Sequence, residues 1–428
     1  MTPARFDAVV VGGGPAGSAT AILLARAGWS VALLEKQRFP RRKVCGECIA
    51  ASNLPLLDVL GVGETLRENA GPPIRTIGLT HGKRTVVAAM PAGRERNAAW
   101  GRALGREALD TLLVEQAGAS GAHVLQPWSV DDITGQPGHW RCHARHAETG
   151  SGMVLDAMVM IDAHGSWESL RCARGDEPVG RQPGQLLAFK ANFIDSALPD
   201  GMLPILAFRG GYGGMVREDG GMTTLACCMR RDRLDAVRRA HPGLSAGHAV
   251  EQTLRRECAG VDAALARATR AGNWLASGPL RPGIRRFEID QPFLVGNAAG
   301  EAHPIIGEGM SMALQSAFLL SECLLRHRAA GNEVPADAPA EVLIEGPAAW
   351  QQRAGHAYYA QWRMQFAPRL RLAAAFAQVA MQPLPAQLLW PMLHRMPALL
   401  SWGAARAGKV RCAVDPATLS AWAAFQSG

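Results

Sequence analysis

The residues best suited to bind a ligand lie near the N-terminus, in the run Gly12-Gly13-Gly14-Pro15-Ala16-Gly17. The spacing Gly-x-Gly-x-x-Gly is typical of dinucleotide sites: Gly12 permits a tight turn, Gly14 lets the backbone approach a pyrophosphate, and Gly17 allows a helix to pack closely on a strand. The phosphates would lie at the helix N-terminus beside Pro15 and Ala16, where free N–H groups and the helix dipole favour an anion.

An acidic residue stands where such a site would meet the ribose. Glu35 comes eighteen residues after Gly17 and can accept hydrogen bonds from both hydroxyls of an adenosine ribose. Its charge would repel a 2′-phosphate, so the site is predicted to take FAD or NAD rather than NADP. Lys36, the next residue, is counted among the cofactor contacts. A Gly-rich run by itself could also serve only a structural turn.

Three predicted elements position these residues: a strand over 6–11, a helix over 18–27 that is closed by Gly28, and a buried strand over 30–35. Together they form a βαβ unit, the context in which the motif gains value. Farther along, the sequence predicts a helix over 106–117, strands over 139–146 and 153–163, an antiparallel sheet over 185–230, a strand over 293–295, a helix over 309–326 and, after a linker at 332–339, helices with proline breaks.

The composition indicates a globular protein. Apolar residues make up 48% of the 428 residues and charged residues 19%. Nine cysteines are an odd number that fits a disulfide framework poorly, and the few residues before the first strand leave no room for a secretory signal. We therefore expect a cytoplasmic protein with reduced thiols. No second Cys or His pair stands at ligand spacing, so no metal site is expected.

The net charge of +8 is confined to one region. Residues 346–414 hold eight Lys and Arg residues and no Asp or Glu, so the rest of the chain sums to zero. This distribution indicates one cationic region rather than a basic protein. No RNA-binding or helix-turn-helix pattern occurs, and no nucleic-acid partner is expected.

A second Gly-rich constellation follows the predicted strand at 293–295. It contains Gly296, Asn297, Pro304, Gly307, Glu308, Gly309 and Met310. This run resembles the second FAD motif of the para-hydroxybenzoate hydroxylase and geranylgeranyl reductase superfamily. The resemblance implies FAD, with these seven residues as cofactor contacts and a helix N-terminus aimed at the pyrimidine edge of the flavin. Asn297 replaces the usual Asp, and its amide can still bond the ribityl hydroxyls.

Further segments are similar to the same superfamily. The run 106–113 looks like its Arg-x-x-Leu-Asp-x-x-Leu helix, which makes Arg106 a flavin contact, and 161–166 resembles the loop beside the pyrophosphate. The run 39–47 is similar to the Cys-Gly-Glu segment of geranylgeranyl reductases, which adds Arg42 and Cys45 to the cofactor contacts.

The resemblance leaves the reaction open between branches. The Tyr-x-Trp-x-Phe-Pro signature of prenyl reductases is absent, and the absence of Trp-x-Trp-x-Ile-Pro among the eleven Trp residues argues against halogenases. We favour a monooxygenase, fed transiently by NAD(P)H, that hydroxylates a hydrophobic phenolic, polyketide or carrier-bound substrate. The alternatives are a reductase of a C=C bond in an isoprenoid, polyene or lipid, and a flavin-binding protein without turnover.

Three residues are catalytic candidates, each with a plainer interpretation. Cys45 could form a redox dithiol with Cys48, or belong only to the loop near the flavin. Tyr212 could orient a polar group of the substrate or fill a sheet position. His303 could assist proton transfer as a neutral imidazole, or pack against Pro304.

The predicted fold is α/β: a Rossmann-like FAD domain of the glutathione-reductase type (1–75, 98–175 and 275–330), interleaved with an antiparallel-sheet substrate domain (76–97 and 176–274) and followed by a C-terminal helical region (331–428). Within the last region, 372–393 carry no charge, but three prolines argue against a spanning helix. With its flanking Arg and Trp residues, this segment resembles an interfacial membrane anchor. A lid, a dock for an acidic carrier protein through 346–414, and simple packing are the alternatives.

Overall fold

The computed structural model describes residues 3–93, 98–166, 182–332 and 346–424. Its N-terminal half is built on a seven-stranded sheet with the order β7-β2-β1-β10-β9-β8, in which β17 also pairs with β10. The strands are β1 (Ala4–Val11), β2 (Val31–Leu34), β7 (His123–Leu125), β8 (Trp128–Gln136), β9 (His139–His146), β10 (Gly152–Asp162) and β17 (Phe293–Leu294). Parallel pairing of β1 with β2 and β10 gathers the carboxyl ends of these strands at one edge.

Helices cover this sheet. The first face carries α1 (Pro15–Arg26), α4 (Arg106–Ala119) and α8 (Gly309–Asn332), and α1 packs against both of the others. Side chains of α1 and α8 that are almost wholly buried, such as Ile22 and Phe318, form the main core together with Val10 and Ile161 from the sheet. This half also contains two short helices, α2 (Leu54–Val59) and α3 (Gly63–Asn69). Two short strands, β3 (Cys48–Ile49) and β6 (Arg102–Ala103), pair with each other.

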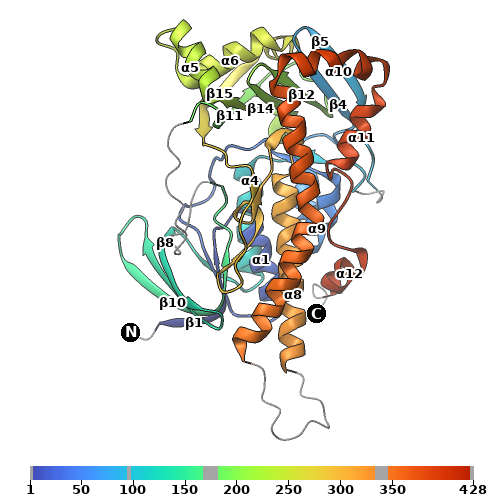
Figure 1. Ribbon diagram of the computed structural model, residues 1–428. Helices are drawn as coiled ribbons and strands as arrows, with labels where there is room; N and C mark the ends of the chain where they lie inside the picture. Colours follow the sequence, from blue (N-terminus) through green and yellow to red (C-terminus); the bar gives the residue numbers. More distant parts are fainter. Residues whose placement is uncertain (1–2, 94–97, 167–181, 333–345, 425–428) are drawn as a thin grey trace, which may run out of the picture.

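A second seven-stranded sheet lies at the other end of the molecule (Figure 1). Its order is β15-β11-β14-β13-β12-β4-β5, and every neighbouring pair except β12 and β4 is antiparallel. The strands are β4 (Thr76–His81), β5 (Arg84–Ala89), β11 (Leu186–Ile194), β12 (Met202–Phe208), β13 (Gly211–Arg217), β14 (Thr223–Arg230) and β15 (Thr269–Ser277). Helices α5 (Arg231–Ala240), α6 (Ala246–Glu257) and α7 (Ala259–Leu265) cover its outer side.

The last helices join the two ends. Helix α9 (Pro347–Met381) runs beside α8 and continues to the second sheet, where α10 (Pro383–Arg395) and α11 (Ala398–Arg406) turn back over β4 and β5 (Figure 1). Helix α12 (Pro416–Ala424) returns to the first half, and β16 (Gly283–Ile284) and β18 (Gly300–Glu301) form a two-stranded ribbon. Trp362 and Phe366 bury the middle of α9 against the core.

The predicted fold class is confirmed: a Rossmann-like sheet with helices, a mostly antiparallel sheet and C-terminal helices. Most of the predicted linker at 332–339 lies outside the described residues, whereas Asn332 ends α8. The domain boundaries remain a prediction. Among the described residues, no helix combines the length and the apolar character needed to cross a bilayer.

Candidate active site

The turn between β1 and α1 has the geometry that its glycines predict. Gly12 has φ of 107°, and a Cβ built there would lie 2.6 Å from the Ala163 carbonyl oxygen. A Cβ on Gly17 would lie 1.9 Å from the Gly12 oxygen, so α1 can approach β1 this closely only with glycine here. At Gly14, by contrast, the nearest atoms to such a Cβ are guanidinium nitrogens of Arg106 and Arg41, each 3.8 Å away. The helix N-terminus therefore opens onto free space flanked by cations.

Glu35 lies at the end of β2, where the motif requires an acidic residue. Only 4% of the residue is exposed. Its Oε2 accepts a hydrogen bond from the Gly13 N–H at 2.9 Å, and its Oε1 accepts one from the Gln37 N–H at 2.9 Å. Each carboxylate oxygen can accept a further bond, so this buried carboxylate is able to receive ribose hydroxyls.

Three cationic side chains gather beside Gly14. Arg106 donates from Nε and Nη2 to Asp110 at 2.6 and 2.7 Å. Arg41 reaches Asp110 at 3.5 Å, but its buried Nε has no hydrogen-bond partner among the described residues. Burial, together with the charges of Arg106 and Arg41, lowers the pKa of Lys43 to about 8. A surplus of positive charge and an unpaired donor at a helix N-terminus are the features that a pyrophosphate would satisfy, so these residues fit FAD.

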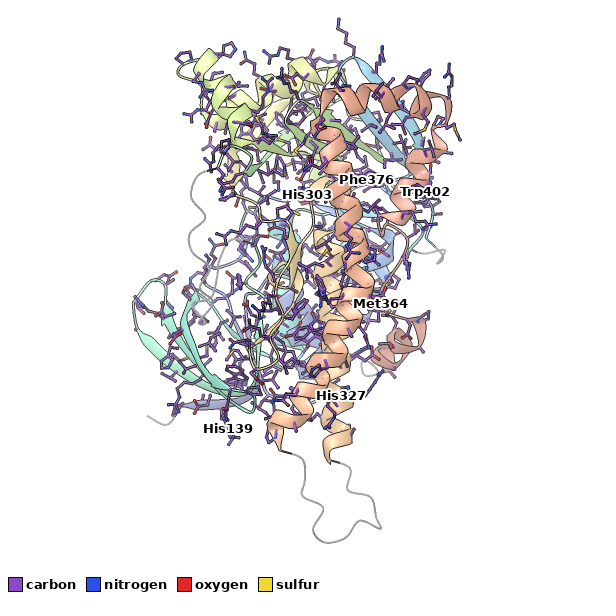
Figure 2. The ribbon with its side chains drawn as sticks, viewed as in Figure 1. His139, His303, His327, Met364, Phe376 and Trp402 are labelled. Atoms are coloured by element: carbon purple, nitrogen blue, oxygen red, sulfur yellow. The ribbon has the colours of Figure 1, made fainter. Side chains whose placement is uncertain are left out.

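One cavity of about 610 Å³ runs from this cationic groove into an apolar chamber. The groove is lined by Gly14, Glu35, Lys43 and Arg106, and the chamber by side chains of β4, β12, β13, α9, α10 and α11. Apolar lining residues of the chamber include Ile77, Leu79, Leu203, Ile205, Phe376 and Trp390. Figure 2 shows Phe376 on α9 and Trp402 on α11, two of the elements that enclose the chamber.

Polar groups occur where the groove meets the chamber. The Tyr212 hydroxyl is 3.1 Å from Nδ1 of His303, although His303 itself does not line the cavity. Burial raises the pKa of Tyr212 well above 10 and lowers the pKa of His303, so both are neutral at pH 7. Glu301 lines the cavity nearby with 3% exposure, and burial raises its pKa even though the Arg281 N–H donates to it at 3.1 Å.

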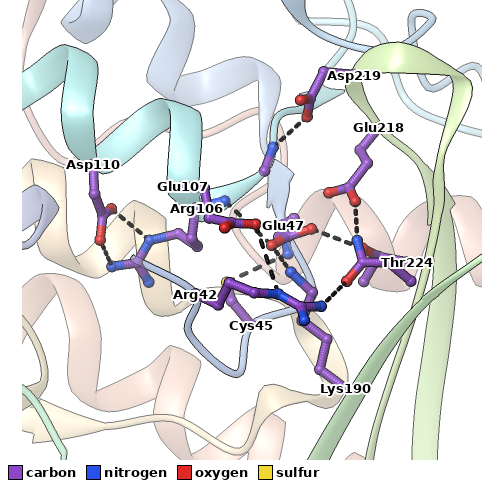
Figure 3. Close-up of polar contacts among 12 residues, drawn as sticks. Arg42, Cys45, Glu47, Arg106, Glu107, Asp110, Lys190, Glu218, Asp219 and Thr224 are labelled. Atoms are coloured by element: carbon purple, nitrogen blue, oxygen red, sulfur yellow. Dashed lines mark hydrogen bonds and ion pairs between the residues drawn. The ribbon is translucent and has the colours of Figure 1, made fainter. Parts of the chain in front are cut away.

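The Cys45 loop is tied to the second sheet by a buried polar cluster (Figure 3). Glu47, which has φ of 56°, pairs with Lys190 and accepts a hydrogen bond from Thr224 Oγ1 at 2.7 Å. Burial and the neighbouring Glu47 raise the pKa of Glu218 to about 9, so Glu218 is protonated at neutral pH. The Cys45 thiol lines the cavity and lies beside Arg106, and both Cys45 and Cys48 are free thiols.

The structure brings most of the sequence-predicted contacts together. Those that line the cavity are Gly12, Gly14, Pro15, Ala16, Glu35, Lys36, Cys45, Arg106, Tyr212, Asn297, Pro304, Gly307, Gly309 and Met310. Those outside its lining are Gly17, Arg42, Gly296, His303 and Glu308. Arg42 turns to Asn192 and Glu107, and Arg41 occupies the place beside Gly14 instead. The Asn297 amide donates to Ser166 Oγ at 2.6 Å.

Glu308 belongs to the loop at 304–309 but does not line the cavity. It is fully buried, and Arg369 of α9 donates to its Oε2 at 3.3 Å. Lys409 donates to the Gly307 carbonyl at 3.2 Å and lines the cavity. The C-terminal region therefore holds the loop at 304–309 in place.

Sequence reasoning missed Arg41, Lys43, Glu301, Arg369 and Lys409. Arg41 and Lys43 flank the predicted contact Arg42, so a cationic run was visible but the inward-facing members were not. Glu301 lies two residues before the candidate His303. Nothing in the local sequence connects Arg369 and Lys409 with residues some sixty and a hundred positions earlier.

Comparison with known proteins identifies the protein family. The family described as "FAD binding domain" matches residues 5–333. The chain belongs to this FAD-binding family. The predicted superfamily is thereby confirmed, with FAD as the cofactor, and it includes FAD-dependent monooxygenases and halogenases.

Sequence relatives of the chain differ in their names. It is 28% identical to conditioned medium factor receptor 1 of Dictyostelium discoideum over 344 residues, 75% of this chain and 63% of that protein. It is 31% identical to a 1H-pyrrole-2-carbonyl-[peptidyl-carrier protein] chlorinase of Pseudomonas fluorescens over 182 residues, 37% and 40% of the two chains. A menaquinone reductase of Mycolicibacterium smegmatis is 34% identical over 160 residues, which are 37% of this chain and 35% of that protein. The chain spans less than two thirds of each of these relatives.

Solved structures share the fold. The myxobacterial chondrochloren halogenase CndH aligns with a TM-score of 0.73 at 20% identity, covering 98% of this chain and 96% of its own. PqsL of Pseudomonas aeruginosa, in complex with 2-aminobenzoylacetate, aligns with a TM-score of 0.67 at 17% identity, covering 89% and 98%. Halogenases are thus among the similar proteins, and these comparisons do not decide between the branches.

Proposed function

We propose that this oxidoreductase is a monooxygenase that takes electrons from NAD(P)H and hydroxylates a hydrophobic phenolic, polyketide or carrier-bound substrate. The observation that carries the proposal is the continuous cavity that joins the cationic groove to the apolar chamber. A flavin whose phosphates lie at Gly14 would extend toward the loop at 304–309 and meet the chamber there.

Bound and reduced, FAD supplies the electrons that activate O₂, and the protein must bind, orient and dry the reactants. The chamber is suited to keeping water away from the reactants, because apolar side chains from the second sheet and from α9–α11 form its walls. An apolar wall excludes water and favours an apolar substrate over a polar one.

The polar groups where the groove meets the chamber are placed to bind the substrate oxygen and to transfer its proton. A neutral Tyr212 hydroxyl, 3.1 Å from His303 Nδ1, can hold a substrate oxygen by a hydrogen bond without itself ionising. The Glu301 carboxylate accepts the phenolic proton. Burial raises the pKa of Glu301, which makes its carboxylate a stronger proton acceptor. Both side chains line the cavity.

The reductant is proposed to bind transiently, because the sequence contains one Gly-x-Gly-x-x-Gly motif and no second one for a nicotinamide. The second candidate function is reduction of a C=C bond. It is favoured by the Cys-Gly-Glu segment, in which Cys45 lines the cavity and Glu47 is held by Lys190.

One experiment separates these reactions. The FAD-loaded protein is reduced anaerobically by NADH or NADPH in the presence of lipophilic phenols or polyenes, exposed to O₂ with chloride or bromide present, and its products are analysed by mass spectrometry. Gain of one oxygen atom supports the proposal. Gain of two hydrogen atoms before O₂ is admitted indicates the reductase, and replacement of hydrogen by halogen indicates a halogenase. Either of these last two results would contradict the proposed hydroxylation.

A further inference from the structure

Large apolar side chains are exposed at one end of the molecule. Nine residues of this kind are exposed in the described part of the chain, and six of them belong to α10, α11 and the turn between them. These six are Leu384, Leu388, Leu389, Met392, Met396 and Trp402, here called the α10–α11 platform. Leu384 and Leu388 are 72% and 80% exposed. An apolar cluster of this size on an outer helix marks an interaction surface rather than a tolerated single residue.

The platform borders the mouth of the cavity. Leu389, Met392 and Trp402 line the cavity and are also exposed, while Trp390 between them is buried against His81 of β4. Helix α10 thus has one side turned to the chamber and another turned to the surroundings.

Positive charge accompanies the platform. Arg395 and Arg406 are exposed at the ends of α10 and α11, and neither forms an ion pair within the described part of the chain. The Arg406 guanidinium lies 5.4 Å from the ring centre of Trp402. The sequence holds no Asp or Glu from 346 to 414 that could neutralise this charge.

We propose that the α10–α11 platform docks on the surface of an anionic lipid bilayer. Exposed leucine and methionine on one face, a tryptophan at the edge and arginines beside it are the composition of a helix that lies in the membrane interface. Complementary charge would let the arginines recognise an acidic protein, but it gives Leu384 and Leu388 no role, whereas lipid acyl chains accept both. The platform lies on the surface without crossing the bilayer.

Docking in this way places the mouth of the cavity at the lipid surface, so that a lipid-dissolved substrate can enter the chamber without crossing water. That consequence rests on the proposed function. Docking itself needs no turnover, so vesicle binding and product formation can fail separately.

The test uses the full chain loaded with FAD and sedimented with vesicles of phosphatidylcholine, with and without phosphatidylglycerol. The double variant Leu384→Ser/Leu388→Ser should lower the partition coefficient onto anionic vesicles by about tenfold or more, because two side chains lose most of their transfer free energy. The variant Arg395→Gln/Arg406→Gln should lower it by about tenfold on anionic vesicles and leave binding to phosphatidylcholine unchanged.

The matched control is Met364→Ser. Met364 is 67% exposed but lies on α9, nineteen residues before α10 begins. Figure 2 shows it on α9, away from Trp402 on α11. It should bind vesicles as the original chain does. Flavin content and thermal unfolding verify that each variant is folded. The proposal is overturned if the original chain does not sediment with anionic vesicles, if the leucine variant binds as well as Met364→Ser, or if a purified acidic carrier protein binds the platform where vesicles do not.

Discussion

Replacing Gly14 with alanine separates the fold from cofactor binding more cleanly than any other change in the Gly-rich turn. Gly14 has φ of −75° and ψ of −178°, an extended conformation that alanine adopts freely. A methyl group there meets nothing closer than 3.8 Å. The variant Gly14→Ala should therefore unfold at the same temperature as the original apoprotein or higher, since such a substitution stabilises by about 0.4–1 kcal/mol.

The same substitution should weaken FAD binding. The methyl group would occupy the space between the N-terminus of α1 and the guanidinium groups of Arg41 and Arg106, where the pyrophosphate is expected. Loss of one charge-assisted hydrogen bond costs about 1.5–3 kcal/mol, which corresponds to an FAD dissociation constant about 10–100-fold larger. Fluorescence titration of the apoprotein with FAD measures it.

Gly17→Ala is the contrasting variant. Its Cβ would lie 1.9 Å from the Gly12 oxygen, so α1 must move and the apoprotein itself should lose about 1–3 kcal/mol of stability. If Gly14→Ala is folded and binds FAD as tightly as the original chain, the pyrophosphate does not lie at this turn and the reasoning is wrong.

Three further predictions concern charged groups. Because the pKa of Lys43 is about 8, FAD affinity should fall as pH rises above that value, whereas Lys43→Met should bind weakly without this pH dependence, as titrations at several pH values would reveal. Glu301→Gln should lower the hydroxylation rate by about 10²–10⁴-fold and abolish the acid limb of its pH profile, since the base form of Glu301 is lost as pH falls through its raised pKa; an unchanged profile would exclude this role. Arg369→Leu should cost about 3–5 kcal/mol in denaturant unfolding by leaving the buried Glu308 without its partner, and adding Glu308→Gln should recover part of that loss; no recovery would contradict the pairing.

Local sequence patterns predicted the first βαβ unit well, because its determinants are local. Strand β1, the turn at Gly12 and helix α1 follow from β-branched residues, positive φ and close packing within some twenty-five residues. The fold class and the superfamily were predicted for the same reason, since each motif is a short run at a strand end.

The shape of the chamber depends on contacts that no local pattern contains. Helix α9 continues through Pro368 as one helix, although prolines were expected to break this region. Its path along α8 is fixed by buried aromatic residues such as Trp362 and Phe366, which pack against the core formed by the first half of the chain. Only this packing places Phe376 over the second sheet.

The charged neighbours of the cofactor groove were equally hidden. The sequence shows three consecutive basic residues at 41–43, but which of them face Gly14 depends on the path of the loop, which turns Arg41 inward and Arg42 toward Asn192. Glu308 was predicted to contact the cofactor, and its burial against Arg369 is set by the docking of α9. Side-chain direction in a loop is a tertiary property.

The proposed function requires the FAD pyrophosphate to lie between the N-terminus of α1 and the Arg41–Lys43–Arg106 cations, with the flavin ring at the entrance of the apolar chamber. A crystal structure of the FAD complex would show both positions. We expect a phosphate oxygen within hydrogen-bonding distance of the Arg41 Nε and the ring beside Pro304 and Tyr212. Phosphates bound away from Gly14, or a ring separated from the chamber by protein, would contradict it.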